Sequence, residues 1–213
     1  MKSLRNYIFE KIKELPKYVS GLIVFDIDDT ILKVDSSLMS IYKKTENGEI
    51  ALTTEEFAKD PDASDSSKIS LFDFRDFDDP YKVYNSIMSG TPLIKNLKIM
   101  DDYINAGYDF CFLTARGCED TVKNALDNFL KFRNKNGALE KLGKIFKKTL
   151  SHAVNDKFKN YPGNTDAEKK ANVLKKLCEQ YDKVIFVDDD KKNVNAARNL
   201  NIKNLKVIKA WDE

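Results

Sequence analysis

The sequence is poor in cysteine and histidine. Its 213 residues include three cysteines, Cys111, Cys118 and Cys178, and one histidine, His152. The cysteines are odd in number and show no paired spacing, which favours a reducing compartment over a disulfide-stapled secreted domain. Because no histidine, cysteine or serine partner accompanies His152, we interpret it as a structural or surface residue and exclude a histidine-based mechanism.

Long apolar runs and an excess charge of one sign are also missing. No window approaches the roughly 18 apolar residues of a membrane span, and residues 1–10 contain no apolar run of signal-peptide length. Lys and Arg number 36 against 34 Asp and Glu, so net charge gives no reason to expect a nucleic-acid or membrane partner. Because 42% of the residues are hydrophobic, the chain can build a sizeable core. We expect a cytoplasmic protein that does not contact a membrane.

Three short apolar runs predict the strands of a buried parallel sheet. They cover residues 22–25, 110–113 and 184–187, and each is rich in β-branched or aromatic residues without strict alternation. Helical periodicity follows over residues 93–106, 119–132, 166–181 and 193–200, and further strands are expected at 144–150 and 205–208. This alternation predicts an α/β fold, a doubly wound three-layer sandwich with a central parallel sheet.

Residues 31–90 interrupt the alternation of strands and helices. Residues 41–53 are typical of a hairpin with Asn47-Gly48 as its turn, and residues 60–79 are rich in Asp, Ser and Pro. We therefore predict a core formed by residues 1–30 and 91–213, with an N-terminal helix over residues 1–20. Residues 31–90 would form a flap hairpin and a small cap inserted after the first strand.

Polar side chains follow each of the three apolar runs. The runs lead into Asp26-Ile27-Asp28-Asp29-Thr30, Thr114-Ala115-Arg116-Gly117 and Asp188-Asp189-Asp190. In a parallel sheet these segments emerge at the carboxyl edge, where open α/β sheets bind ligands. Carboxylates brought together repel one another unless a cation lies between them, and oxygen ligands favour Mg²⁺. Any one of these aspartates alone would be interpreted as a helix cap or a turn residue.

The order and type of these residues resemble the haloacid-dehalogenase-like superfamily of phosphohydrolases. Residues 26–30 match its D-x-D-x-T motif, and Thr114 matches the Ser or Thr that ends its second strand. Asp188-Asp189 matches its acidic pair, and Lys170 or Lys169 matches the lysine before that pair. The resemblance covers residues 21–31 and 93–208.

The resemblance implies a catalytic role for four residues. Asp26 would be the nucleophile that forms an aspartyl-phosphate, and Asp28 would act as general acid and base. Thr114 would hold a phosphoryl oxygen through its hydroxyl group, and Lys170 would neutralise charge. We favour Lys170 over Lys169 because it shares a helix face with Leu174 and Leu177, which pack toward the sheet.

The resemblance also implies a magnesium site and a substrate site. Asp26, Asp188 and Asp189, with the backbone carbonyl of Asp28, would hold Mg²⁺. The substrate site would contain Thr30, which braces the loop, the backbone N–H of Ala115 and the side chain of Arg116. Asp190 is interpreted as a helix N-cap, and Asn193 either orients the acidic loop or is structural.

The leading functional hypothesis is a Mg²⁺-dependent phosphatase that acts on a phosphorylated small molecule, a nucleotide or a polynucleotide end. One alternative is a non-catalytic binding or structural protein on the same scaffold, and another is a phosphotransferase or mutase. The basic run from Lys131 to Lys148 is interpreted as a solvated face, with contact to a polyanion as the second interpretation. The sequence makes no prediction of the oligomeric state.

Overall fold

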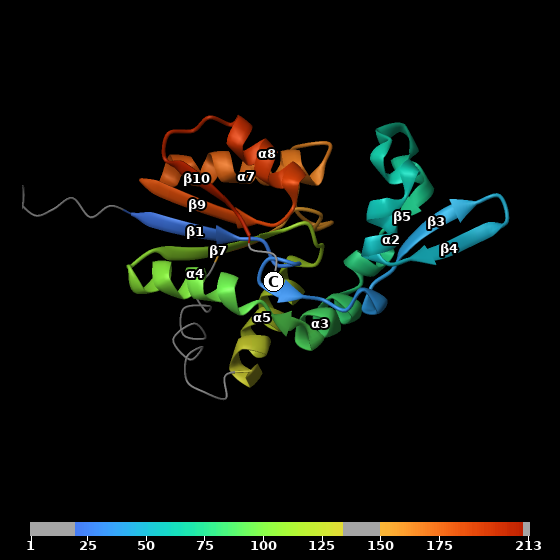
Figure 1. Ribbon diagram of the computed structural model, residues 1–213, viewed down its shortest axis with the longest axis horizontal. Helices are drawn as coiled ribbons and strands as arrows, with labels where there is room; N and C mark the ends of the chain where they lie inside the picture. Colours follow the sequence, from blue (N-terminus) through green and yellow to red (C-terminus); the bar gives the residue numbers. More distant parts are fainter. Residues whose placement is uncertain (1–19, 134–149, 211–213) are drawn as a thin grey trace, which may run out of the picture.

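The computed structural model describes residues 20–133 and 150–210, and its centre is a five-stranded parallel sheet (Figure 1). The strand order is β10-β9-β1-β7-β8. The strands are β1 (Gly21–Phe25), β7 (Asp109–Thr114), β8 (Leu150–Ala153), β9 (Lys183–Asp188) and β10 (Leu205–Lys209). The apolar runs predicted to be strands therefore lie side by side at the centre of the sheet, as β9, β1 and β7.

Both faces of the sheet are buried, which explains why the central strands lack a polar alternation. Ile23 and Phe25 point to one face, where α4 (Ile94–Asn105) and α5 (Glu119–Arg133) cover them. Leu22 and Val24 point to the other face, toward α7 (Asp166–Gln180) and α8 (Lys191–Asn199). The three-layer α/β sandwich predicted from the sequence is confirmed.

The ends of these helices follow local sequence signals. The Thr165 side chain accepts the Glu168 N–H at the start of α7, and Asp190 accepts the Lys192 N–H at the start of α8. The N-cap predicted for Asp190 is confirmed. After α4 the chain turns at Gly107, whose φ of 88° lies in the left-handed region that glycine adopts without strain.

The connections place a topological switch point between β1 and β9. From β1 the chain moves outward through β7 to β8, then crosses to the other side of β1 to form β9 and β10. At such a point the connections leave the sheet in opposite directions, and a crevice opens beyond the carboxyl ends of the two strands. Asp26 follows β1 directly, and Asp188 ends β9.

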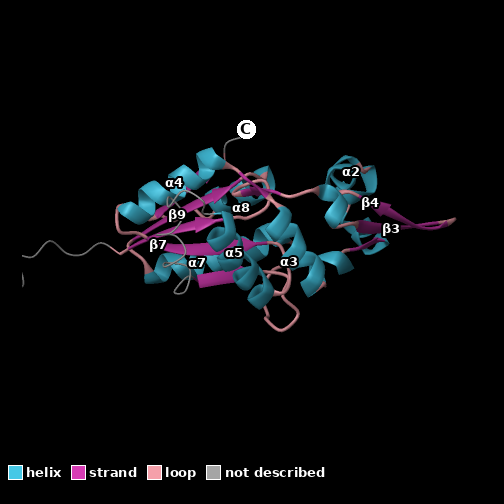
Figure 2. Cartoon of the chain, turned by 90° about the horizontal axis from the view of Figure 1, so that it is seen from below, coloured by secondary structure: helices cyan, strands magenta, loops and turns pink. Residues whose placement is uncertain are grey.

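A small antiparallel insertion follows β1 (Figure 2). Its sheet has the order β4-β3-β5, and a second small sheet pairs β2 with β6. The strands are β2 (Leu32–Lys33), β3 (Ile41–Thr45), β4 (Gly48–Leu52), β5 (Phe72–Asp73) and β6 (Thr91–Pro92). The insertion also contains α2 (Thr54–Lys59) and the 3₁₀ helices η1 (Ser36–Leu38), η2 (Pro61–Ser64), η3 (Ser66–Leu71) and η4 (Arg75–Asp78).

The predicted hairpin is present, but its turn lies one residue earlier than expected. Thr45 pairs with Gly48, so Glu46 and Asn47 form the turn and Gly48 begins β4. The φ of Gly48 is 119°, a conformation that residues with a Cβ rarely adopt. The glycine is therefore needed where the returning strand starts, rather than inside the turn.

Helix α3 (Pro80–Ser89) was not expected from the sequence, and it joins the insertion to the core. Val83 and Ile87 are fully buried in the same apolar cluster as Phe112 and Val122. Figure 2 shows α3 between the core and the β3–β4 hairpin. The last part of residues 31–90 therefore packs as part of the core, while the division into core and cap remains a prediction.

Several predictions fall on residues outside the described ranges. These are the N-terminal helix over residues 1–20, apart from Ser20, most of the strand over residues 144–150, and the basic run from Lys131 to Lys148, apart from its first three residues at the end of α5. Within residues 20–133 and 150–210, no helix combines the length and apolar character needed to cross a bilayer.

Candidate active site

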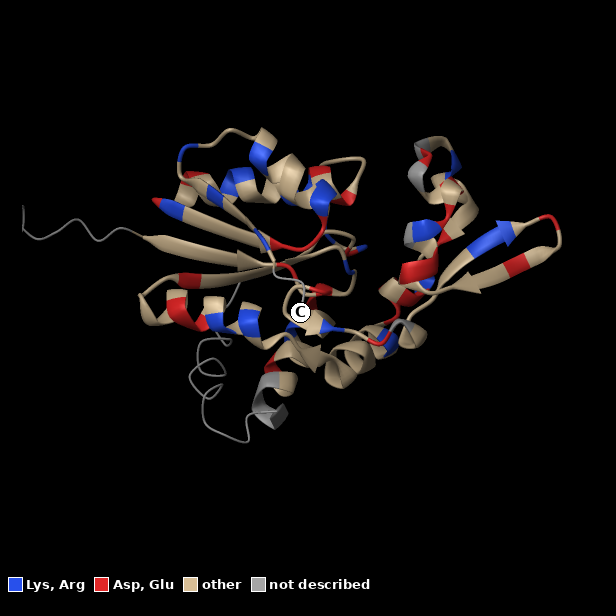
Figure 3. Cartoon of the chain, in the orientation of Figure 1, with Lys and Arg blue, Asp and Glu red and all other residues tan. Residues whose placement is uncertain are grey.

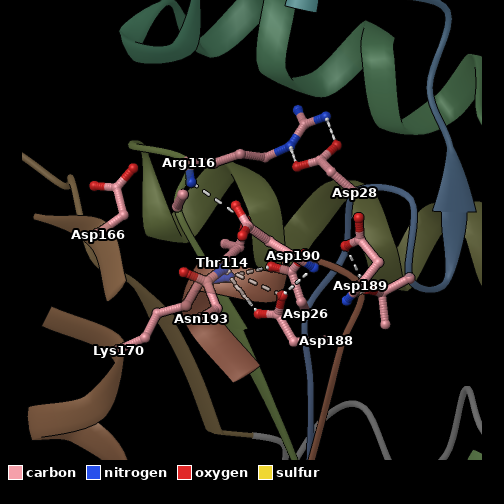
Figure 4. A network of polar contacts seen from close by, with 12 residues as sticks. Asp26, Asp28, Thr114, Arg116, Asp166, Lys170, Asp188, Asp189, Asp190 and Asn193 are labelled. Atoms are coloured by element: carbon pink, nitrogen blue, oxygen red, sulfur yellow. Dashed lines mark hydrogen bonds and ion pairs between the residues drawn. The ribbon is translucent and has the colours of Figure 1, made fainter. Parts of the chain in front are cut away.

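Three carboxylates meet where β1 and β9 end. Asp26, Asp188 and Asp189 each offer an oxygen atom, and these atoms all lie within 4.8 Å of one another. Asp188 is fully buried and Asp26 is 5% exposed. Figure 3 shows acidic residues gathered at this point of the molecule, and Figure 4 shows the side chains in detail. Two strands from distant parts of the sequence thus supply one acidic group.

Lys170 is the cation of this group. Its Nζ, on a side chain 2% exposed, donates to Asp26 Oδ1 at 2.8 Å and to Asp188 Oδ2 at 2.9 Å. Burial favours the neutral amine, but the charges of Asp26 and Asp188 outweigh it and raise the pKa of Lys170 above its usual value. Lys169 instead donates to Asn155 Oδ1 at 2.5 Å. Of the two candidate lysines, Lys170 is the one that reaches the acidic group.

Asp188 is fixed by donors from α8 and from the residue that caps its start. Asn193 Nδ2 lies 3.1 Å from both of its carboxylate oxygens, and the backbone N–H of Asp190 donates to Asp188 Oδ1 at 2.9 Å. Asn193 is itself buried, with 8% of its surface exposed. Of the two interpretations left open for Asn193, the geometry favours the one in which it orients the acidic loop.

Thr30 braces the second carboxylate of the acidic pair. Its hydroxyl donates to Asp189 Oδ1 at 3.0 Å and accepts from the Asp189 N–H at 3.1 Å. Burial, followed by the negative charge of Asp188, raises the pKa of Asp189 to about 6. Thr30 therefore acts on the loop that carries the acidic pair.

The charges and the donor atoms of this group fit a divalent cation. Burial raises the pKa of Asp26, and Asp188, Asp28 and Asp189 raise it further against the opposing effect of Lys170. With all three carboxylates ionised and Lys170 protonated, two negative charges would be uncompensated in a buried place, and a bound divalent cation would balance them. Carboxylate oxygens are ligands of hard cations such as Mg²⁺. The residues present are thus suited to hold one divalent ion.

The loop after β7 is held by hydrogen bonds from the residues that follow β8. The Thr114 and Ala115 carbonyl oxygens accept from the Val154 N–H at 2.9 Å and from Asn155 Nδ2 at 2.7 Å. The Thr114 hydroxyl oxygen accepts the Arg116 N–H at 3.2 Å, so its own hydrogen can be donated to a ligand. Sequence reasoning missed Asn155, because it lies in a segment with no periodic pattern or motif to mark it.

Asp28 and Arg116 lie apart from the acidic group and bind each other. Arg116 Nε donates to Asp28 Oδ2 at 2.8 Å, and Arg116 Nη2 donates to Asp28 Oδ1 at 2.6 Å. Figure 4 shows this pair directed away from Asp26 and Asp188. The structure therefore brings together Asp26, Asp188, Asp189 and Lys170, while the Asp28 carboxylate points elsewhere.

The fold and the site define an α/β protein with a parallel five-stranded sheet and a buried acidic group that could hold a metal ion. No protein-family model matches the sequence, and no curated protein matches it either. What can be said of its activity therefore comes from the residues themselves.

Proposed function

We propose that this protein is a Mg²⁺-dependent phosphohydrolase of the haloacid-dehalogenase-like type. The observation that carries the proposal is the convergence of Asp26, Asp188 and Asp189 at the switch point, with Lys170 bridging two of them. A phosphate ester is negatively charged and repels a carboxylate nucleophile. A site for such an ester therefore needs positive charge, which allows the carboxylate to approach phosphorus. The motif order along the chain supports the same proposal.

The reaction proceeds in two steps on Asp26. A carboxylate oxygen of Asp26 bonds to phosphorus while the bond from phosphorus to the ester oxygen breaks, and Asp28 gives its proton to that oxygen. Asp28 then takes a proton from water, and the resulting hydroxide attacks phosphorus. The bond from phosphorus to Asp26 breaks, which releases inorganic phosphate and restores the free carboxylate.

The other residues of the site bind and orient. Asp26, Asp188, Asp189 and the carbonyl of Asp28 would hold Mg²⁺, which neutralises charge on the phosphoryl group when it is bound. Lys170 keeps a fixed positive charge beside the nucleophile. The Thr114 hydroxyl and the Ala115 N–H hold a phosphoryl oxygen, in an orientation that the contacts of Asn155 and Val154 maintain.

The substrate is a phosphorylated small molecule or a nucleic-acid end, in the cytoplasm. The insertion after β1 stands beside the carboxyl edge of the sheet (Figure 1). A cap of this modest size would leave the site accessible to a bulky or extended substrate. Contact with a polyanion through the run from Lys131 to Lys148 would suit a nucleic-acid end, and a phosphate-release screen across nucleotides and phosphorylated oligonucleotides would test that choice.

The proposal is tested by phosphate release from an aryl phosphate, with Mg²⁺ and with a chelator. Asp26→Asn should lower kcat by about a thousandfold or more, since it removes the nucleophile. Asp29→Asn is the matched control, because Asp29 is exposed in the same loop, and it should keep near-normal turnover.

Two other results would change the interpretation. Failure to release phosphate with any divalent metal would favour the non-catalytic scaffold. If substrate disappears faster than phosphate is released when an alcohol is added, the phosphoryl group is being transferred to the alcohol, which would favour a phosphotransferase. Near-normal turnover by Asp26→Asn would contradict the role given to Asp26.

A further inference from the structure

Arg116 is a buried arginine that joins the loop after β7 to two other parts of the molecule. The residue is 2% exposed. Its Nε and Nη2 bind both oxygens of Asp28, and its Nη1 donates to Ser86 Oγ at 2.7 Å and to the Val83 carbonyl oxygen at 3.4 Å. Because Ser86 and Val83 belong to α3, the guanidinium group is held in place independently of Asp28.

This ion pair conflicts with the acid and base role of Asp28. Bound at both oxygens, the Asp28 carboxylate points toward Arg116, whereas proton transfer to a leaving group requires it to turn toward Asp26 (Figure 4). When Asp28 turns, Arg116 keeps its charge, because a guanidinium is not deprotonated in proteins. A buried charge that loses its partner is strongly unfavourable. Turning of Asp28 therefore requires another anion in its place.

The place that Asp28 occupies can be reached from solvent. The Asp28 side chain is 37% exposed, although Arg116 behind it is buried. A group entering this place would meet the edge formed by Nε and Nη2, whose two parallel donors match two oxygens of a phosphate or carboxylate. We infer that the substrate carries a second oxyanionic group, which binds this edge of Arg116 and releases Asp28 for proton transfer.

The inference rests on the proposed function and narrows its substrate class. Among phosphomonoesters, those with an additional phosphate or carboxylate are the substrates, and those with a neutral remainder react slowly. A second anion that only added a binding contact would lower KM and leave kcat unchanged. Exchange of the substrate anion for Asp28 raises kcat, because the acid and base becomes available only after the exchange.

The test uses the full chain with Mg²⁺ and alkyl phosphates of increasing chain length. Each length is supplied with a methyl, a carboxylate or a second phosphate at its far end. At the best length, kcat for an anionic end should exceed kcat for the methyl end by about tenfold or more. The preferred end distinguishes a carboxylate from a phosphate. Equal kcat values at all lengths would overturn the inference and leave the proposed phosphatase activity intact.

Variants locate the effect at Arg116. Arg116→Gln should abolish the preference for an anionic end. Arg75→Gln is the matched control, because Arg75 in the insertion is also paired with carboxylates, Glu49 and Asp73, and it should keep the preference. A preference that persists in folded Arg116→Gln overturns the inference. If this variant fails to fold, the inference is still tested by comparing the methyl, carboxylate and phosphate ends of the alkyl phosphates with the unaltered protein.

A binding measurement separates failure of the inference from failure of the proposed function. If no substrate is turned over, the phosphatase proposal fails. Calorimetric titration of the same protein with methylphosphonate and with methylenediphosphonate then reports on Arg116 directly. Tighter binding of the diphosphonate that is lost in Arg116→Gln supports a second anion site, and equal affinities overturn it.

Discussion

Two adjacent lysines show how far sequence reasoning reaches at the scale of single residues. The position of Lys170 on the apolar face of its helix predicts that it points toward the sheet, and its Nζ lies between Asp26 and Asp188. Lys169, one position earlier, is rotated by about 100° and binds Asn155 instead. Helix geometry settles such a choice because the helix and its buried face are both clear from the sequence.

Replacing each lysine by methionine tests this difference. Lys170→Met leaves two buried carboxylates without their cation, so the metal-free protein should lose about 3–5 kcal/mol of unfolding free energy at neutral pH. Its kcat should fall by about 10²–10³, the usual loss of one fixed charge donor. Lys169→Met should change both much less. Urea unfolding and aryl phosphate hydrolysis measure the two effects, and equal losses in both variants would contradict the assignment.

The single histidine lies in a separate polar network, as its structural interpretation predicts. His152 Nδ1 is 3.0 Å from the hydroxyl of Tyr161, which donates to Glu119 Oε2 at 2.8 Å. Glu119 also accepts from the Ala153 N–H at 3.0 Å and pairs with Lys159. The network ties β8 and the loop after it to the start of α5.

This network predicts a pH dependence of stability. Burial lowers the pKa of His152, against the opposing charge of Glu119, so the folded state takes up its proton less readily than the unfolded state does. Above the unfolded pKa of about 6.5 both states are neutral, and stability falls as the pH drops below that value.

The measurement is urea unfolding between pH 5 and 8, and the comparison is with His152→Gln, which cannot titrate. The difference in unfolding free energy between the two proteins should change in favour of the variant as the pH falls. Because the difference cancels carboxylates common to both, a constant difference across this range would contradict the expected shift.

At the scale of elements, four of the five strands in the sheet and its covering helices could be predicted. Strand β8, which shares only Leu150 with the strand expected over residues 144–150, and most of the insertion could not. Buried strands and amphipathic helices have strong patterns, and α4, α5 and α7 begin and end within one residue of their expected limits. In the insertion, strands of two residues and short 3₁₀ helices leave little pattern. Asp79 and Pro80, at the N-cap and first position of α3, are a typical signal for the start of a helix. The acidic stretch that precedes them obscured this signal.

Helix α3 offers the prediction that belongs to this scale. Ile87 is fully buried against the core, so Ile87→Ala should lower the unfolding free energy of the whole protein by about 2–5 kcal/mol. Ile50, 46% exposed on β4, is the matched control, and Ile50→Ala should stay within about 0.5 kcal/mol. The measurement is the midpoint of urea unfolding for each variant, compared at an unchanged dependence of the unfolding free energy on urea concentration. An unaltered midpoint for Ile87→Ala would mean that α3 is not part of the core.

At the scale of the whole molecule, the site exists because of the strand order. The sequence could predict that Asp26 and Asp188 meet, since both lie at the carboxyl ends of neighbouring parallel strands. It could not predict that the Asp28 carboxylate turns to Arg116, because that pairing depends on where α3 places Ser86 and Val83. Convergence follows from topology, whereas side-chain direction follows from packing.

The central claim is that Asp26 and Asp188 share one divalent ion, and that the carboxylate of Asp26 receives the phosphoryl group. The most direct measurement is a crystal structure of the protein grown with Mn²⁺ in place of Mg²⁺ and with beryllium fluoride as a phosphoryl mimic. We expect one anomalous peak within bonding distance of Asp26 and Asp188, and a fluoroberyllate attached to Asp26. Metal bound at another place, together with an Asp26 that carries no fluoroberyllate and still pairs with Lys170, would contradict the account.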